Sequence, residues 1–572
     1  MKLFFWLIHN HPVSDSPHND FDYIVVGGGT AGLVIANRLS EDPNVTVAVI
    51  ETGKDVRSDS GVLDVDLAGV TYSPELDWNF NSTVQPQLGD RVIAHHADKA
   101  LGGTTVINGM YYIRGDKANY DAWELLGNPG WNWDTLFPYF LRSENLAIPT
   151  SAQQAAGITY NPQVHGENGY LKTGHPHQVD NGTFHTSAKD TCERLGFSLN
   201  QDINSGETRG YESAARAYYE PIDGRPNLQI IQGTVKRITS SSSVRGGELV
   251  ATGVEYTDVN GNLISVTAKS EVILSAGTYI SPLILEASGI GNPRVLDRSN
   301  IETRVELPGV GEGFQDQPLW VLMFQASENL TGHVPFAAFA NSEDVFRADT
   351  NSIAAATESN LAAWARAIAK RLNGGVSTNA LQKRFQIQHD VIFHKKASIA
   401  EIEFFSLGDV IGSVFSPTLP FSCGSVHLNA AAEIGNPAID PNFLSVDFDM
   451  HTALKLGKIA RKLWDTQPLS TLAGTLLNPG EAALPPNATD AQWTKFLTSA
   501  AVPAFHCIGT CAMLPREMGG VVDPTLKVYG TANVRVVDAS VIPHLMSGHP
   551  SAAVYALAER AADIIKGGHA VG

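Results

Sequence analysis

The sequence predicts an α/β fold with a Rossmann-like nucleotide-binding unit, and three observations near the N-terminus carry this prediction. An apolar run at residues 23–26 has the length and composition of a buried strand. A glycine-rich turn follows it and leads into a helical pattern at residues 33–39. A second apolar run at residues 45–50 ends in an acidic residue, Glu51. Strand, turn, helix, strand and acid in this order are typical of a βαβ unit that binds a dinucleotide.

Each part of the turn has a physical task in such a unit. The G-x-G-x-x-G spacing is formed by Gly27, Gly29 and Gly32. The first glycine allows a tight turn, the second lets the backbone approach a pyrophosphate, and the third lets helix and strand pack closely. The N-terminus of the helix offers N–H groups to phosphates, and Glu51 accepts hydrogen bonds from ribose hydroxyls. The motif predicts a dinucleotide site and leaves NAD and FAD open.

Composition excludes several other classes of protein. The chain has 572 residues, of which 43% are hydrophobic and 17% charged, as in globular proteins with a large core. This length predicts two or more folding units. The formal net charge of −19 disfavours binding to nucleic-acid phosphates. Apolar runs stay well short of the ~20 residues that span a bilayer, so no membrane span is predicted.

The first twenty residues leave the cellular location open. Lys2 precedes an apolar run at residues 3–8, as at the start of a secretory signal. The run is shorter than the usual ~7–15 residues, and no clear small-x-small cleavage site follows it. Residues 1–20 therefore fit either a polar tail or an incomplete signal, and both secretion and an intracellular location remain open.

Further glycine-rich and apolar segments follow along the chain. Residues 99–115, KALGGTTVINGMYYIRG, contain a second glycine turn suited to close approach by a flat or phosphorylated ligand. Residues 277–293 and 307–318 contain two more glycine-rich stretches. Near the C-terminus, residues 534–537 indicate a strand, and residues 551–565 are apolar at helical spacing.

Together these segments resemble the glucose–methanol–choline (GMC) family of FAD-dependent oxidoreductases, over residues 22–565. Both of the family's signature segments have counterparts here, around residues 101–110 and 277–291. Among its members, the chain is most similar to the fungal glucose dehydrogenases and glucose oxidases, with aryl-alcohol oxidase-like members also similar. Residues 143–171 carry much of this closer likeness. The resemblance implies an enzyme that uses FAD, and not NAD, to oxidise an alcohol.

The resemblance also implies how the chain is divided. A discontinuous, Rossmann-like FAD-binding domain is expected from residues 21–130, 226–320 and 507–572. An α+β substrate-binding domain with an antiparallel sheet is expected from residues 131–225 and 321–506.

The resemblance further assigns the residues that hold the cofactor. They are Gly27, Gly29, Thr30, Ala31, Gly32, Glu51, Gly102, Gly103, Thr104, Asn108, Gly109, Val235, Asp538, Ala539 and Pro550. The three glycines of the first turn and Glu51 belong to the ADP half, and Val235 lies on the adenine side. Residues 102–109 line the flavin and its pyrophosphate, and the last three lie near the isoalloxazine ring. Ile107 stands where relatives with covalent flavin have a histidine, so FAD is predicted to be non-covalent.

The chain departs from the family beside these segments. His95, His96 and Asp98 lie where relatives often have arginine and glycine, and a solvated loop is the favoured interpretation. Gly313 stands where many relatives have asparagine, and Gln317 where many have histidine. We expect these two changes to loosen contacts with the flavin without abolishing them.

Two histidines are the predicted catalytic pair. His506 lies in AFHCIGTCAM and His549 in MSGHP. In the family, the first faces flavin N5 and a histidine or asparagine at the second position completes the pair. Imidazole, with an unperturbed pKa of ~6.5, suits removal of a hydroxyl proton. His506 is therefore the predicted general base and His549 its hydrogen-bonding partner, with the two roles open to exchange.

The cysteines allow a different interpretation of the same segment. Cys507 and Cys511 flank the turn after His506, and the other cysteines are Cys192 and Cys423. Four cysteines at these spacings do not form a disulfide framework. A zinc site needs three or four ligands, and the sequence offers no second cluster, so no metal is predicted. Packing is the favoured role for the two thiols, and a redox-active pair is the alternative.

The substrate is predicted from the residues before His506. Sugar-oxidising relatives have an arginine and an asparagine where this chain has Val502 and Ala504. A buried hydroxyl without a partner costs ~1–3 kcal/mol, so the loss of two anchors argues against glucose. Glu401 matches an acidic residue of the sugar enzymes, although a strand-edge carboxylate is an equally good interpretation.

The predicted substrate is therefore a small-molecule aryl, allylic or polyketide-type alcohol of secondary metabolism, oxidised to an aldehyde, ketone or lactone. The electron acceptor, oxygen or a quinone- or dye-type compound, is open, with a dehydrogenase slightly favoured. The alternatives are a sugar dehydrogenase and a non-redox lyase or cyclase of the same fold.

Overall fold

The computed structural model describes most of the chain. The described residues are 19–63, 74–155, 157–175, 182–197, 202, 204, 213–332, 334, 337–429 and 433–567, the side chains of 242–245 excepted. The tail or signal predicted for residues 1–20 lies outside these ranges except for its last two residues.

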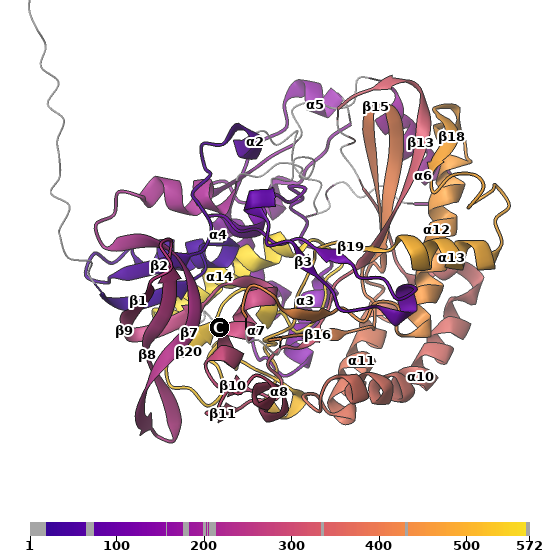
Figure 1. The fold of residues 1–572 in the computed structure, drawn as a ribbon. Helices are drawn as coiled ribbons and strands as arrows, with labels where there is room; N and C mark the ends of the chain where they lie inside the picture. Colours follow the sequence, from indigo (N-terminus) through magenta and orange to yellow (C-terminus); the bar gives the residue numbers. More distant parts are fainter. Residues whose placement is uncertain are drawn as a thin grey trace, which may run out of the picture.

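A mainly parallel sheet forms one end of the molecule (Figure 1). Its central strand β1 (Asp20–Val26) pairs with β2 (Val47–Glu51) on one side and with β9 (Leu263–Leu274) on the other. The start of β7 (Leu228–Arg245) extends the sheet beside β2, and β20 (Val534–Val536) extends it beside β9. Three distant parts of the chain thus meet in one sheet, and its strands β2 and β20 are buried along their whole length, as in α/β proteins.

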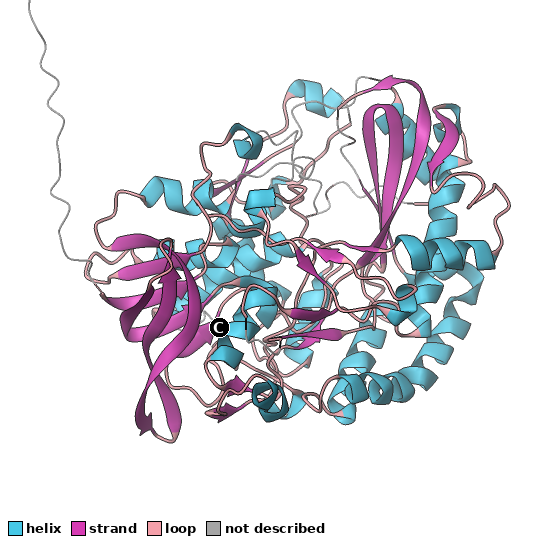
Figure 2. Ribbon diagram, viewed as in Figure 1, coloured by secondary structure: helices cyan, strands magenta, loops and turns pink. Residues whose placement is uncertain are grey.

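The same sheet continues into an antiparallel extension. The second half of β7 and the first half of β9 both pair with β8 (Glu248–Asp258), and the three strands project beyond the parallel part (Figure 2). The long strands β7 and β9 therefore join the parallel and antiparallel parts without a break.

Helices cover the parallel strands and begin at their carboxyl ends. Helix α1 (Thr30–Leu39) follows β1 and packs against α14 (Pro550–Ile565), which also contacts α4 (Trp133–Ser143). Helix α7 (Gly277–Ala287) follows β9. Both α1 and α14 are buried on nearly all sides, which explains their apolar sequences. Proline suits the first position of a helix, so α14 begins at its proline.

An antiparallel sheet forms the other end of the molecule (Figure 1). Its order is β14 (Ala337–Ala340), β15 (Ala400–Pro417), β13 (Pro318–Leu330) and β18 (Ala473–Asn478), and β19 (Val502–Pro503) pairs with the start of β13. Burial alternates along the first half of β13, so one face of the sheet is covered. The covering helix is α12 (Asp447–Trp464), which contacts β15.

Further helices lie along the same side of the molecule (Figures 1 and 2). They are α10 (Thr350–Arg371), α11 (Thr378–Phe393) and α13 (Asp490–Ala500). The remaining α-helices are α2 (Ser60–Leu63), α3 (Lys117–Leu125), α5 (Ser151–Ala155), α6 (Phe184–Arg194), α8 (Pro293–Arg298) and α9 (Ser342–Phe346). The short strands are β3 (Phe80–Asn81), β4 (Ala94–His95), β5 (Glu144–Leu146), β6 (Leu171–Thr173), β10 (Ile290–Gly291), β11 (Val305–Glu306), β12 (Glu312–Phe314), β16 (Gly424–His427) and β17 (Ala438–Asp440).

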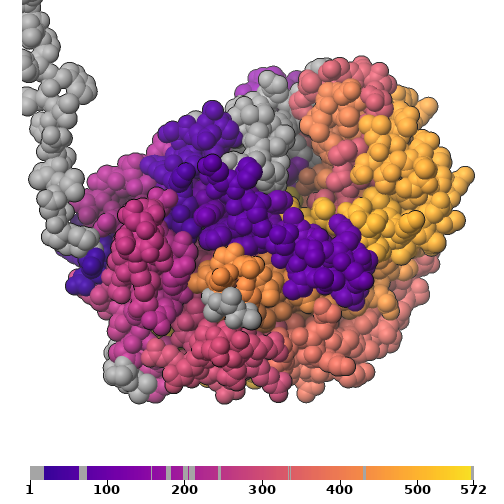
Figure 3. All heavy atoms as spheres, viewed as in Figure 1, coloured from indigo at the N-terminus to yellow at the C-terminus, as the bar shows by residue number. Residues whose placement is uncertain are grey.

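The predicted fold class is confirmed: a Rossmann-like α/β sheet lies beside a second, antiparallel sheet with helices. The domain boundaries stay a prediction, and β13 crosses the one placed at residue 320. The chain segment that contains β3 runs across the face between the two ends of the molecule (purple in Figure 3). Within the described part of the chain, the helices are too short or too polar to cross a membrane.

Candidate active site

A cavity of about 380 Å³ connects the parallel sheet to the antiparallel sheet. At one end, which we call the nucleotide end, it is lined by Gly27, Gly29, Thr30, Glu51 and Val235. At the other, which we call the histidine end, it is lined by Glu401, Glu403, His506 and His549. The nucleotide end lies at the carboxyl ends of parallel strands, which is where ligands bind in open α/β sheets.

Two glycine turns meet at the nucleotide end. Gly27 has a φ of +102°, and a Cβ there would lie 2.5 Å from the Ser275 carbonyl oxygen. A Cβ on Gly32 would lie 2.0 Å from the Gly27 carbonyl oxygen, and one on Gly103 would lie 2.7 Å from the Gly29 Cα. Side chains are therefore excluded where these backbones approach each other.

The N-terminus of α1 faces this cradle. Gly29 is its N-cap, and among the described residues no side chain caps it and none in its first turn is acidic. Its first N–H groups and the helix dipole suit an anion such as a pyrophosphate. Thr30 and Ala31 line the cavity beside it.

Glu51 ends β2 at the nucleotide end. Its carboxylate accepts hydrogen bonds from the N–H groups of Gly28, at 2.7 Å, and Gly53, at 2.6 Å. Burial raises the pKa of this carboxyl to about 7. Val235, on β7, lines the cavity near by. A fixed acidic side chain beside a glycine cradle fits the ribose of a dinucleotide.

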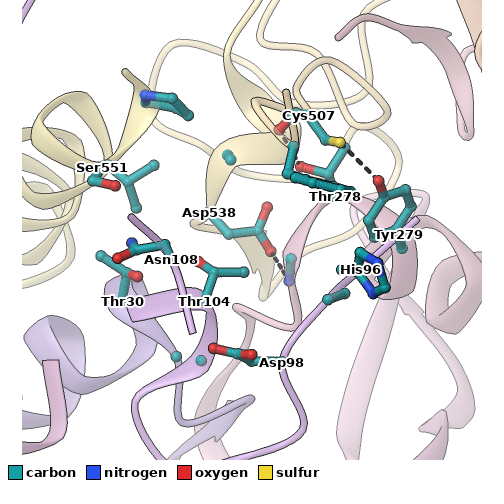
Figure 4. A pocket seen from close by; sticks show the side chains of 18 of the residues that line it. Thr30, His96, Asp98, Thr104, Asn108, Thr278, Tyr279, Cys507, Asp538 and Ser551 are labelled. Carbon is teal, nitrogen blue, oxygen red and sulfur yellow. Dashed lines mark hydrogen bonds between the residues drawn. The ribbon is translucent and has the colours of Figure 1, made fainter. Parts of the chain in front are cut away.

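The second glycine turn lines the middle of the cavity. Gly102 has a φ of +113°, and its N–H donates to the Gly28 carbonyl oxygen at 2.8 Å. Thr104 and Asn108 line the cavity together with Thr30 and Asp538 (Figure 4), and Gly109 lines it as well. The two glycine turns are thus joined directly, as a shared cofactor site requires.

Asp538 and the start of α14 close the opposite wall. The Asp538 carboxylate accepts hydrogen bonds from the Gly277 N–H at 2.9 Å and the Ser281 hydroxyl at 2.6 Å. Ala539 and Pro550 line the cavity, so a second helix N-terminus, that of α14, faces it. Two helix N-termini, a fixed acid and a cradle free of side chains fit the pyrophosphate and ribose of FAD.

His506 is held in one orientation and one tautomer. Its backbone N–H donates to Asp316 Oδ1 at 2.8 Å, and its ring Nδ1 lies 2.6 Å from Gln317 Oε1. The Gln317 amide nitrogen donates to the carbonyls of Thr418, at 2.9 Å, and Met546, at 3.2 Å. Because the nitrogen is engaged there, the amide oxygen faces the imidazole and accepts from Nδ1–H. His506 Nε2 therefore carries the lone pair.

The two histidines lie side by side at the histidine end. The ring centroids of His506 and His549 are 4.4 Å apart. Burial holds the pKa of His506 well below its ordinary value, and His549 lowers it further. His506 is consequently neutral at physiological pH and able to accept a proton.

His549 is held by the antiparallel sheet. Its Nε2 lies 3.0 and 3.2 Å from the two oxygens of Glu401 and 3.5 Å from Glu403 Oε1. The Tyr111 ring lies 5.0 Å from the His549 ring, centroid to centroid. Glu401 is buried and hydrogen-bonded to His549, so the interpretation of Glu401 as a mere strand-edge carboxylate is wrong.

The structure contains a buried series of hydrogen-bonded side chains that was not predicted from the sequence. His95 Nδ1 lies 2.9 Å from the Tyr279 hydroxyl. That hydroxyl lies 2.8 Å from Cys507 Sγ (Figure 4). The Cys507 thiol in turn donates to Asp316 Oδ2 at 3.3 Å. His95 is fully buried, so the interpretation of a solvated loop is wrong for this residue. Burial lowers its pKa to about 3 and raises that of Asp316 to about 7.

These hydrogen-bonded side chains are relevant to the prediction that no metal is bound. Ligand-type atoms of His95, Asp316 and Cys507 lie within 4.8 Å of one another, as do those of Glu401, Glu403 and His549. Within each group, hydrogen bonds already connect the side chains. Burial also raises the pKa of the Cys507 thiol well above its ordinary value, which disfavours the thiolate that a metal binds. The absence of a metal stays a prediction.

The remaining predicted residues are placed as follows. Cys507 and Cys511 are buried, and all four cysteines, which lie in described ranges, are free thiols. Ala504 and Glu401 line the cavity, but Val502 is exposed on β19 and is not among the described lining residues. Gly313 has a φ of +81°, which explains a glycine there. Tyr111, Asp316 and Glu403, which contact the two histidines, were not predicted from the sequence. For Glu403 a signal was present, because it follows Glu401 at the two-residue spacing of one strand face.

The chain is similar to known proteins over nearly its whole length. Residues 21–319 and 420–558 match the N-terminal and C-terminal domains described as GMC oxidoreductase. The chain is 46% identical to glucose oxidase-like protein fsoC of Humicola fuscoatra, over 96% of each chain. It is 32% identical to a glucose oxidase of Penicillium chrysogenum, over 98% of this chain and 94% of that one.

Solved structures are similar over nearly the whole chain. An FAD-dependent oxidoreductase from Chaetomium thermophilum superposes with a TM-score of 0.86 at 28% identity, covering 96% of this chain and 99% of that one. A fungal aryl-alcohol oxidase superposes with a TM-score of 0.84 at 27% identity, with the same two coverages.

Proposed function

Because the chain belongs to the GMC oxidoreductase family, whose enzymes use FAD, we propose that it oxidises an alcohol with His506 as the general base. The observation that carries the proposal is the contact between His506 Nδ1 and the fixed amide oxygen of Gln317. It leaves the lone pair of a neutral imidazole on Nε2, in a residue that lines the cavity. A base in this state is what removal of a hydroxyl proton requires.

The residues of the histidine end have separate roles in this reaction. His506 Nε2 takes the hydroxyl proton, while Asp316 and Gln317 hold the backbone and ring of His506 in place. His549, oriented by Glu401, hydrogen-bonds the substrate oxygen. When bound, FAD supplies the acceptor for the hydrogen on the alcohol carbon, which leaves as hydride. The alcohol thereby loses one proton and one hydride and becomes a carbonyl compound.

The cofactor is held without a covalent bond in this proposal. Ile107, which lines the cavity, offers no nucleophile to the flavin. The remaining contacts are the glycine cradle, Glu51, Asp538 and the two helix N-termini. Denaturation is therefore expected to release all of the FAD into the supernatant.

The substrate is an alcohol of low polarity, of the aryl, allylic or polyketide type. Aromatic and apolar side chains line much of the cavity near the histidines, among them Tyr111, Leu319, Phe415 and Phe505. Ala504, where sugar enzymes have a polar anchor, lines it as well. A sugar is the second candidate, because Glu401 occupies the place of an acidic residue in those enzymes. Relatives are named both oxidases and dehydrogenases, so oxygen and dye-type acceptors are both to be tested.

The test is reduction of the bound flavin without oxygen. We expect 4-methoxybenzyl alcohol to bleach the oxidised flavin bands, glucose to do so far more slowly, and His506→Ala to abolish bleaching by either. If glucose is the better substrate by kcat/KM, the proposed substrate class is wrong. If no alcohol bleaches the flavin yet another compound is converted, a lyase or cyclase reaction replaces the proposal.

A further inference from the structure

Arg384, on α11, is a buried arginine without an ionic partner. The residue is only 9% exposed, and in the described part of the chain no carboxylate pairs with it. Its printed contact is a single long hydrogen bond, from Nη2 to the Pro543 carbonyl oxygen at 3.4 Å. A guanidinium carries five N–H donors and keeps its charge in proteins. Most of these donors therefore have no acceptor among the described residues.

The acidic groups around Arg384 do not neutralise it. The Cys423 thiol interacts with it, but burial raises the pKa of this thiol to about 11, so the thiol is neutral at pH 7. The carboxylates that act on Cys423 have partners of their own: Glu312 contacts His427, Asp440 contacts Arg371, and Asp449 accepts from two backbone N–H groups. The charge of Arg384 consequently remains unbalanced.

Two neighbours of the guanidinium offer it no acceptor. A Cβ at Gly313 would lie 3.3 Å from Arg384 Nη1 and 3.7 Å from Nη2, so a side chain there would lie against the guanidinium. Glycine provides no such side chain, whereas many relatives have asparagine at this position. His544, which follows Pro543, has a buried Nε2 without a hydrogen-bond partner in the described part of the chain. Burial, and then the charge of Arg384, lowers the pKa of His544 to about 3, so its ring is neutral.

We propose that Arg384 binds a small inorganic anion of the size and charge of chloride, with His544 as a second donor. A buried charge without a partner strongly destabilises a protein, and an anion on the guanidinium removes that penalty. Arg384, Gly313 and His544 are not among the described residues that line the cavity, so the site is separate from the one that holds the cofactor.

The anion site lies among the segments that carry the two catalytic histidines. Gly313 precedes Gln317 by four residues, and His544 precedes His549 by five. The position of a Cβ on Gly313 is also 3.6 Å from the carbonyl oxygen of Gly509, which follows His506 by three residues. Bound anion is therefore expected to stabilise these segments against α11, whatever reaction the enzyme catalyses.

Thermal unfolding of the holoenzyme in different salts tests the proposal. Sodium gluconate, whose anion is too large for a buried site, is replaced stepwise by sodium chloride or sodium bromide at pH 7. The ionic strength is kept constant, so the screening of surface charges does not change. We expect the melting temperature to rise by a few °C and to level off as the site fills, because a ligand of the folded state stabilises it. The same melting temperature in all three salts would overturn the proposal, since water at Arg384 gives that result.

Three variants show whether the effect belongs to Arg384. Arg384→Met keeps an unbranched side chain without the charge, so we expect no response to chloride and a melting temperature in gluconate at or above that of the wild type. Gly313→Asn places an amide oxygen beside the guanidinium, and asparagine tolerates the φ of +81°, so the response should be at least halved. Lys383→Met removes an exposed charge next to Arg384 and should keep the full response. An unchanged response in Arg384→Met would contradict the assignment.

Anomalous diffraction from bromide gives a readout that depends neither on a variant nor on turnover. Crystals of the wild-type holoenzyme grown in sodium bromide are expected to show an anomalous peak within hydrogen-bonding distance of the Arg384 guanidinium. The absence of a peak at Arg384 would overturn the anion site and leave the proposed function untouched. A peak there in an enzyme that oxidises no alcohol would support the anion site while the proposed function fails.

Discussion

The two ends of the cavity differ in the groups that form them, which are mainly backbone groups at one end and side chains at the other. At the nucleotide end, backbone does most of the binding: glycines at Gly27, Gly32 and Gly103 bring main chains together, and N–H groups hold Glu51. At the histidine end, side chains hold side chains, as Gln317 holds His506 and Glu401 holds His549. Where backbones approach this closely, a substitution that adds a Cβ disrupts the whole site. Where side chains form the site, a single substitution can remove one contact and leave the others in place.

The largest effect is expected at the nucleotide end. In Gly32→Ala, the new Cβ would lie 2.0 Å from the Gly27 carbonyl oxygen, so α1 must move away from β1. We expect the purified variant to contain no FAD by its visible spectrum and to lose all activity. Gly224→Ala is the control, because a Cβ at Gly224 meets nothing within 4 Å. Retention of full flavin by Gly32→Ala would show that the close approach is not needed.

The second largest effect is expected at the histidine end, where a substitution should reduce catalysis without reducing cofactor binding. His506→Ala removes the base without touching the glycine cradle. Loss of a general base typically lowers the rate by about 10²–10⁴-fold, so kcat/KM for the best alcohol is expected to fall by that factor. The flavin content and the melting temperature should stay near those of the wild type. A fall of less than tenfold would mean that another group, with His549 the first to test, takes the proton.

The contrast between the two ends also explains what could be predicted from the sequence. The βαβ unit is local, and its strand, turn, helix and acid follow one another within residues 20–51. Its elements were predicted with ends a few residues off: α1 begins at Thr30, three residues before the apolar pattern. The sheet neighbours of β1 could not be read in this way, since β9 and β20 lie far along the chain.

The histidine end depends on contacts between distant segments. Asp316 meets His506, and Tyr279 meets Cys507, across about two hundred residues of sequence. No periodicity records such contacts, so His506 and His549 were found only through the resemblance to a family. His95 was misjudged for the same reason, because a polar residue in a loop is buried only if a partner such as Tyr279 is brought to it.

A smaller effect is expected from the residue that orients His506. Gln317→Leu removes the acceptor for Nδ1–H but keeps a side chain of similar size. We expect kcat to fall about 10–100-fold, with KM little changed, because the tautomer with its lone pair on Nε2 is no longer favoured.

Gln317→Glu distinguishes orientation from packing. A carboxylate beside Nδ1 stabilises the imidazolium and therefore raises the pKa of His506. The acid limb of the kcat/KM profile is expected to move to higher pH, while activity at high pH recovers relative to Gln317→Leu. If both variants show the same profile, Gln317 acts through packing alone.

The smallest effect concerns the acid of the nucleotide end and is measured as stability. Burial raises the pKa of Glu51 from 4.5 to about 7 in the folded protein. A raised folded-state pKa means that this stabilising contribution is complete below pH 4.5 and is lost as the pH rises through 7. Glu51→Gln removes the buried charge, so the FAD-free variant is expected to melt a few °C above the wild type at pH 8 and to differ less at pH 5. Glu328→Gln, which replaces an exposed carboxylate on β13, serves as the control and should leave the melting temperature unchanged at both pH values.

The same Glu51→Gln protein should bind FAD more weakly at pH 8, because an amide is a poorer acceptor for ribose hydroxyls than a carboxylate. If Glu51→Gln raises the melting temperature but weakens FAD binding, Glu51 contributes to cofactor binding while it destabilises the fold. If the substitution lowers both the melting temperature and the affinity for FAD, Glu51 is a structural residue.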